Sequence, residues 1–134
     1  MKPPEYNAHP PETSSSQPLI LALRAAGALG ILAILLLSLM PGDLQAPLRS
    51  GLPGEVEHFM AYAAVACCLR GGFTGRGSSI WIIAGLAALA GMLELLQGFV
   101  TGRGPAISDA VAGAAGAWAG AYAGAALRRV VIDR

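Results

Sequence analysis

Ionisable side chains interrupt three otherwise apolar segments of this 134-residue chain. His58 lies near the start of the first segment, Glu94 near the end of the second, and Asp109 at the start of the third. Inside a membrane such residues are costly, so they usually face a protein interior or a cavity and mark a binding site, a catalytic site or a proton path. With their neighbours they form a candidate site of seven residues: Glu57, His58, Tyr62, Glu94, Gln97, Arg103 and Asp109.

The composition predicts that this site belongs to a membrane protein. Hydrophobic residues make up 54% of the chain and charged residues only 13%, whereas a soluble domain carries about 25% charged residues. The formal net charge of +1 provides no basic field for nucleic acid, and the few aromatic residues are not interleaved with basic ones. We therefore expect a lipid bilayer, and no nucleic acid, as a partner.

Four apolar blocks separated by Pro- and Gly-rich stretches predict an all-α, polytopic bundle of four transmembrane helices with short loops. The blocks are residues 19–40, 56–69, 79–100 and 106–127. The first block spans about 33 Å, enough to cross the hydrocarbon layer. It could instead belong to a cleaved signal peptide, but the polar, Pro-rich leader and the lack of a convincing A-x-A site favour an uncleaved anchor.

The domain organisation follows from these blocks. Residues 1–18 are rich in Pro and Ser and are expected to form a disordered cytoplasmic tail. Residues 19–127 form the membrane domain, and residues 128–134 a short basic cytoplasmic tail.

Basic residues predict the orientation of the bundle. Of the nine Lys and Arg residues, Arg49 and Arg103 lie in loops on one side. The others lie on the opposite side, and they are Lys2, Arg24, Arg70, Arg76, Arg128, Arg129 and Arg134. By the positive-inside rule we expect a multi-pass membrane protein with both termini in the cytoplasm.

The depth of each polar residue in the membrane, estimated from the rise of a helix, predicts that these residues meet near the outer surface of the membrane. The apolar run of residues 59–69 covers only about 16 Å, so spanning the membrane draws Glu57 and His58 to the outer edge of the hydrocarbon. Glu94 lies about 9 Å, and Asp109 about 4.5 Å, inside the outer ends of their blocks. A purely structural role, in which these groups and Arg103 pair with one another, stays open beside a functional one.

Small residues define one face of the last block. Asp109 is followed, at intervals of three or four residues, by four glycines that we call the glycine stripe: Gly113, Gly116, Gly120 and Gly124. Such faces allow close helix packing, either within the chain or between copies in an oligomer. Asp109 is therefore expected to point into the bundle.

No metal site, cofactor or catalytic residue is assigned from the sequence. Cys67 and Cys68 are neighbours near the cytoplasmic end of their block, where neither a disulfide nor a structural zinc site is expected. The chain has no HExxH pair and no GxSxG motif, and Ser108 has no adjacent base. An enzymatic activity is therefore not favoured.

Two motifs resemble those of a known family. The string from Glu57 to Tyr62 resembles the HFxxY signature, and the string from Glu94 to Arg103 resembles the ExxQxFxxxR signature, of the VanZ-like membrane proteins. The match continues through Asp109 to the glycine stripe and covers roughly half of the chain. The family usually has an Asp-Lys pair before HFxxY, where this chain has Gly54 and Glu55, and commonly Asn in place of Gly113.

The resemblance implies a cell-envelope role and, since the family is named after a protein associated with low-level teicoplanin resistance, a link to glycopeptide resistance. It also implies that His58, Tyr62, Glu94, Gln97, Arg103 and Asp109 belong to one site. We expect the protein to bind or modulate a lipid or a lipid-linked cell-wall component, with Arg103 and His58 holding its head group. The alternatives are a membrane-embedded enzyme with His58 or Glu94 as general base, and a proton-coupled ion pathway.

Overall fold

The computed structural model describes residues 16–48, 50–75 and 77–132. Its helices are α1 (Gln17–Ser38), α2 (Gly42–Gln45), α3 (Gly54–Gly72), α4 (Ser78–Gln97) and α5 (Ile107–Val131), with the 3-10 turn η1 (Ala46–Leu48) after α2. The prediction of an all-helical protein is confirmed, whereas the predicted count of four helices is not. The additional helix, α2, has only four residues and lies in the connection between the first two long helices.

Three helices are long and apolar enough to cross a membrane among the residues that the structure describes, namely α1, α4 and α5. The α3 helix is not one of them, because Glu55, Glu57 and Arg70 lower its hydropathy. The structure thus supports a membrane protein with three candidate spans.

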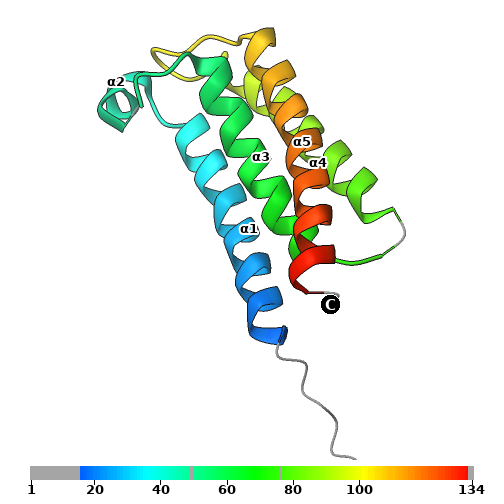
Figure 1. The fold of residues 1–134 in the computed structure, drawn as a ribbon. Helices are drawn as coiled ribbons and strands as arrows, with labels where there is room; N and C mark the ends of the chain where they lie inside the picture. The colour runs from blue at the N-terminus through cyan, green and yellow to red at the C-terminus, as the bar shows by residue number, and fades with distance from the viewer. Residues whose placement is uncertain (1–15, 49, 76, 133–134) are drawn as a thin grey trace, which may run out of the picture.

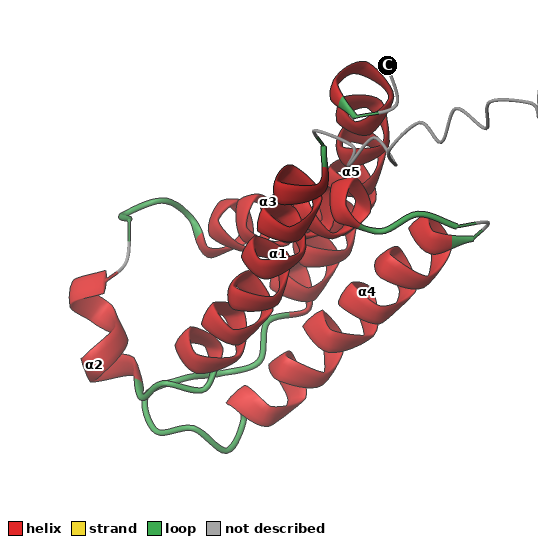
Figure 2. Ribbon diagram, turned by 90° about the horizontal axis from the view of Figure 1, so that it is seen from below, coloured by secondary structure: helices red, strands yellow, loops and turns green. Residues whose placement is uncertain are grey.

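Figure 1 shows α1, α3 and α5 side by side, with α3 in the middle. The view along the bundle in Figure 2 shows α4 on one flank, where it packs mainly against α5. The first residues of α1 and the last of α5 lie at the same end of the bundle, which we call the terminal end. At the opposite end, here called the loop end, lie α2 and the α4–α5 connection.

The glycine stripe of α5 packs directly against the backbone of α3. A Cβ atom at Gly116, Gly120 or Gly124 would overlap with the backbone of Phe59, Ala63 and Cys67, respectively. All four glycines of the stripe are buried inside the chain. The stripe is therefore used for packing within the chain, against α3.

Arginines satisfy the carboxyl end of α3 at the terminal end of the bundle. Arg24 of α1 donates from Nε to the Gly72 carbonyl oxygen (2.8 Å), and Arg128 of α5 donates from Nη1 to the Gly71 carbonyl oxygen (2.9 Å). Cationic side chains stabilise a helix carboxyl terminus, where carbonyl groups lack intrahelical partners.

Two sequence predictions concern the ends of the chain. The predicted disordered tail lies almost entirely outside the described residues, and so do Lys2, Arg49, Arg76 and Arg134. Of the predicted basic tail at residues 128–134, the first residues form the last turn of α5, which continues to Val131 and includes Arg128 and Arg129. Arg128 is held in the helix by its bond to α3.

Candidate functional site

Side chains from three helices meet at the loop end of the bundle. His58 comes from the first turns of α3, Glu94 from the last turn of α4, and Asp109 from the first turn of α5. His58 Nε2 lies 3.5 Å from Glu94 Oε1, and His58 Nδ1 lies 3.7 Å from Asp109 Oδ2. The structure therefore brings together the three residues that the depth argument placed at a similar level.

His58 is held in one orientation by its own helix. Its Nδ1 atom lies 3.0 Å from the carbonyl oxygen of Gly54, one turn earlier. A carbonyl oxygen only accepts hydrogen bonds, so Nδ1 donates and Nε2 faces Glu94. The ring of Tyr62, at i+4, lies nearly parallel to the His58 ring at a centroid distance of 6.4 Å. Tyr62 is fully buried and forms the floor beneath the imidazole.

Glu94 is the most deeply buried acid of the site, with 5% of its surface exposed. Its Oε2 atom accepts a hydrogen bond of 2.7 Å from the backbone N–H of Ala106, just before α5. That N–H belongs to the helix amino terminus, where backbone donors lack intrahelical partners and anions are favoured. Glu94 thus ties α4 to the start of α5 with one oxygen and faces His58 with the other.

Asp109 lies against the first residue of α3. A Cβ atom at Gly54 would lie 3.1 Å from Asp109 Oδ2, which is tighter than usual packing. Glycine at this position therefore lets the amino termini of α3 and α5 approach closely. In the described residues no Lys or Arg forms an ion pair with Asp109 or Glu94, and His58 is the basic group that both face.

Gln97 is buried beside this group, with 2% of its surface exposed. Its Nε2 atom has no hydrogen-bond partner among the described residues. An unsatisfied buried donor costs free energy, so its presence at a pocket wall indicates that a ligand oxygen or a water completes it.

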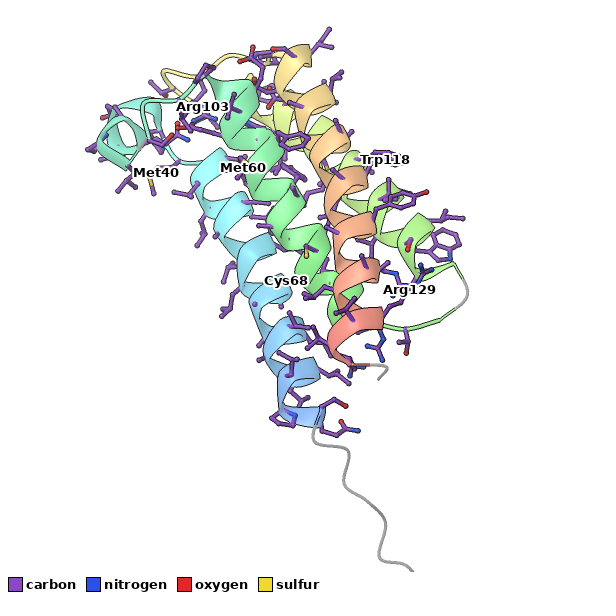
Figure 3. The ribbon with its side chains drawn as sticks, in the orientation of Figure 1. Met40, Met60, Cys68, Arg103, Trp118 and Arg129 are labelled. Carbon is purple, nitrogen blue, oxygen red and sulfur yellow. The ribbon has the colours of Figure 1, made fainter. Side chains whose placement is uncertain are left out.

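Glu57 and Arg103 belong to the rim of the site. Glu57 Oε1 accepts hydrogen bonds from the backbone N–H (2.9 Å) and the hydroxyl (2.6 Å) of Ser50. Arg103 donates to the side-chain oxygen of Gln45 in α2, and Figure 3 shows Arg103 directed toward α2 at the loop end. The pairing of Arg103 with Glu94, which the sequence left open, is not among the described contacts.

Two cavities meet at these rim residues. A polar pocket of about 280 Å³ lies between the two loop-end connections, and its lining residues include Gln45, Gly54, Glu57, His58, Gln97, Arg103 and Asp109. An apolar groove of about 590 Å³ lies between α1 and α3, and its lining residues include Gly30, Ala33, Ile34, Leu37, Met60, Ala61, Ala64 and Val65. The pocket and the groove share four residues, which are Gln45, Glu57, His58 and Arg103.

The connection containing α2 supplies the part of the site that the sequence reasoning missed. Gln45, Ser50 and the Gly54 carbonyl contact predicted site residues, and Gly42 N donates to Thr101 O (3.1 Å) to join the two loop-end connections. The α2 helix is too short to show a hydrophobic periodicity, and the sequence does not indicate which backbone carbonyl will accept a side-chain hydrogen bond. Only the position of the glutamine between Pro41 and Pro47 could have drawn attention to it.

Comparison of the chain with protein-family models, with curated proteins and with solved structures finds no match.

Proposed function

We propose that this chain is an integral membrane protein that binds a lipid, or a lipid-linked component of the cell envelope, at the loop end of its helix bundle. The observation that carries the proposal is the junction of the polar pocket with the apolar groove. A lipid needs both environments, one for its head group and one for its chain. The shared residues put the boundary between the two at His58 and Arg103.

The groove suits a hydrocarbon chain because of what lines it. Ala33 and Leu37 of α1 and Met60 and Ala64 of α3 contribute apolar surface along the length of both helices. The groove lies between two helices on the outside of the bundle, so a chain could enter sideways from the bilayer. Apolar lining with a few polar groups at one end is typical of small-molecule sites.

The pocket suits a head group with phosphate or hydroxyl oxygens. Arg103 supplies a planar guanidinium at the junction, which is the side chain best matched to a phosphate. Gln97 Nε2 offers a further buried donor at the wall of the same pocket. Glu57 and Asp109 provide acceptors for hydroxyl groups.

In the proposed topology α3 crosses the membrane together with α1, α4 and α5, giving four spans with both termini in the cytoplasm. The α3 helix runs the length of the bundle between α1 and α5, and its polar residues lie at its two ends. The basic residues near the terminal end support a cytoplasmic location for that end. A bacterial cytoplasmic membrane, a VanZ-like identity and an effect on teicoplanin susceptibility are proposed from the motif resemblance alone.

Native mass spectrometry in detergent can test lipid binding. We would add phosphatidylglycerol or a polyprenyl phosphate to the delipidated full chain and measure the bound fraction. Ala33→Trp should fill the groove and reduce binding, and Arg103→Gln should reduce binding by removing the head-group contact. Ala84→Trp is the matched control, because Ala84 is exposed on α4 and lines neither cavity.

The proposal is wrong if the unmodified chain binds neither lipid, or if Ala84→Trp reduces binding as much as Ala33→Trp does. Loss of binding in Ala33→Trp with retained binding in Arg103→Gln would place the chain in the groove and remove Arg103 from head-group recognition.

A further inference from the structure

A set of metal-donor side chains from three different helices lies at the wall of the polar pocket, where His58 and Asp109 line the pocket and Glu94 lies behind them. One donor atom from each of His58, Glu94 and Asp109 lies within 4.8 Å of the other two. We propose that these three residues bind one divalent transition-metal ion of the zinc class. The proposal stands on the geometry of the donors and goes beyond the binding of a lipid.

The first argument is the separation of the donors. Zinc binds imidazole nitrogen and carboxylate oxygen at about 2.0–2.2 Å, so two donors on a tetrahedral ion lie about 3.4 Å apart. His58 Nε2 and Glu94 Oε1 are 3.5 Å apart. These two atoms therefore already have the spacing of two ligands on one ion. A carboxylate oxygen of Asp109, at the start of α5, is the third donor of the set, within 4.8 Å of the others.

The second argument is the orientation of the imidazole. Nδ1 of His58 donates to the Gly54 carbonyl oxygen, which leaves the Nε2 lone pair directed at Glu94. Nε2 and the Glu94 oxygen each present an electron pair, so a proton or a metal ion between them is favoured, and a metal ion would use both electron pairs. Metal-binding histidines almost always donate their other ring N–H to a carbonyl or carboxylate, which fixes the tautomer in the same manner. The Gly54 carbonyl has this role here.

The third argument is the balance of charge. Glu94 and Asp109 face one another across His58, and no Lys or Arg of the described residues forms an ion pair with either. Glu94 is almost fully buried, and Asp109 is largely so. Two carboxylates at one point in a membrane protein need positive charge nearby. A divalent ion supplies two charges at the point where the donors converge.

A separate observation indicates a ligand beside the ion. Gln97 lines the same pocket, is 2% exposed, and has an Nε2 atom without a hydrogen-bond partner in the described part of the chain. An ion with three protein ligands keeps at least one position for water or a substrate oxygen. Gln97 Nε2 can donate to that oxygen. If the lipid-binding proposal holds, the oxygen belongs to a head-group phosphate, and the ion offsets the negative charge of the pocket.

The choice of a zinc-class ion follows from the donor types. A mixed set of one imidazole and two carboxylates suits zinc and its transition-metal neighbours, whereas calcium and magnesium prefer oxygen donors alone. Cys67 and Cys68 are soft donors that zinc also accepts, and Cys68 lies far along α3 from the loop end (Figure 3). An experiment has to exclude that added zinc binds to these thiols.

The test uses the full chain with a tag that lacks histidines, purified in detergent and stripped with a chelator. Zn²⁺ is added alone, and the bound metal is measured by equilibrium dialysis with elemental analysis. We expect one Zn²⁺ per chain, with affinity lowered by at least about tenfold in Asp109→Asn and in Glu94→Gln, which each remove a ligand charge. Glu55→Gln is the matched control, since Glu55 is exposed in the first turn of α3.

A second measurement does not depend on the folding of variants. X-ray absorption of the zinc-loaded unmodified chain should show nitrogen and oxygen ligands with imidazole scattering and no sulfur. Binding should also be unchanged in Cys67→Ala, Cys68→Ala. Failure to retain one Zn²⁺ per chain, a sulfur-ligated zinc, or equal weakening by Glu55→Gln and Asp109→Asn would each overturn the proposal. Zinc binding is measured without added lipid. A negative result therefore does not bear on the lipid-binding proposal, which has its own test.

Discussion

At the scale of single residues, the two ends of the bundle use their charged side chains differently. Arg24 and Arg128 at the terminal end donate to backbone carbonyls of α3. At the loop end Glu94 and Asp109 share one histidine, and Gln97 keeps an unpartnered donor in the described structure. Ser78 Oγ at the start of α4 is also without a partner in the described structure. It is therefore the convergence of His58, Glu94 and Asp109, and not the unpartnered donor alone, that favours a ligand at the loop end.

The pairing of His58 with Glu94 gives a prediction about stability. His58→Ala should lower the free energy of unfolding by about 3 kcal/mol, because it leaves the buried Glu94 carboxylate without its basic neighbour. Adding Glu94→Gln should recover a large part of the loss, since the amide oxygen still accepts from the Ala106 N–H and carries no charge. Thermal melting in detergent, without added metal, measures the two single variants and the double variant.

Glu55→Gln provides the reference for removing an exposed acid from the same region. The interpretation fails if His58→Ala melts at the temperature of the unmodified chain. It also fails if the loss of stability in the double variant equals the sum of the losses in the two single variants. In the first case Glu94 has another source of stabilisation, and in the second the two side chains do not interact.

The sequence predicted these residues better than it predicted their partners. His58, Glu94 and Asp109 could be placed at one end of the bundle because helix rise fixes depth within an apolar block. The partner of Arg103 could not be predicted, because Arg103 lies in a connection whose path depends on contacts with Gln45 in α2. The hydrogen bond from the Ala106 N–H to Glu94 could not be predicted either, because it depends on how closely α4 approaches the start of α5.

At the scale of elements, the α3–α5 pair is the centre of the molecule and carries the geometry of the site. The stripe of small residues lets the two backbones approach so closely that the glycines of α5 contact the backbone of α3. The same approach brings Gly54 at the start of α3 against Asp109 at the start of α5. Helix packing and site assembly therefore depend on the same contacts.

A methyl group at the centre of this contact should weaken the fold. Gly120→Ala should destabilise the protein by about 1–3 kcal/mol, because its Cβ atom would overlap with the Ala63 backbone, which has little freedom to move. Gly85→Ala is the matched control, since a Cβ at this helical position of α4 meets nothing within 4 Å. That variant should be neutral or more stable by up to about 1 kcal/mol, because alanine favours helix.

Melting temperatures in one detergent compare the two variants directly. Equal effects of Gly120→Ala and Gly85→Ala would show that the close α3–α5 contact does not determine stability. The sequence predicts the glycine stripe itself. It does not predict that α3 is the helix packed against it, because a helix of this chain and a helix of a second copy offer the same kind of surface.

At the scale of the whole molecule, the structure has a lipid-compatible exterior and a polar site at one end. Large apolar side chains such as Leu29, Leu36, Ile80, Trp81 and Trp118 are more than half exposed. Such a surface is typical of helices that face lipid. The described ends of the chain lie at the end opposite to the site, as the proposed topology of four spans requires.

Cysteine labelling tests this orientation. In a Cys67→Ala, Cys68→Ala background, Ser50→Cys in the α2–α3 connection should react with a membrane-impermeant reagent added outside intact cells. Thr74→Cys in the α3–α4 connection should react only after the membrane is opened, because the proposed topology places the terminal end, with its basic residues, in the cytoplasm. Both positions are exposed, so accessibility to the reagent depends on their side of the membrane. Labelling of both positions from outside would exclude α3 as a membrane span, and labelling of Thr74→Cys alone would invert the proposed orientation and place the polar pocket in the cytoplasm.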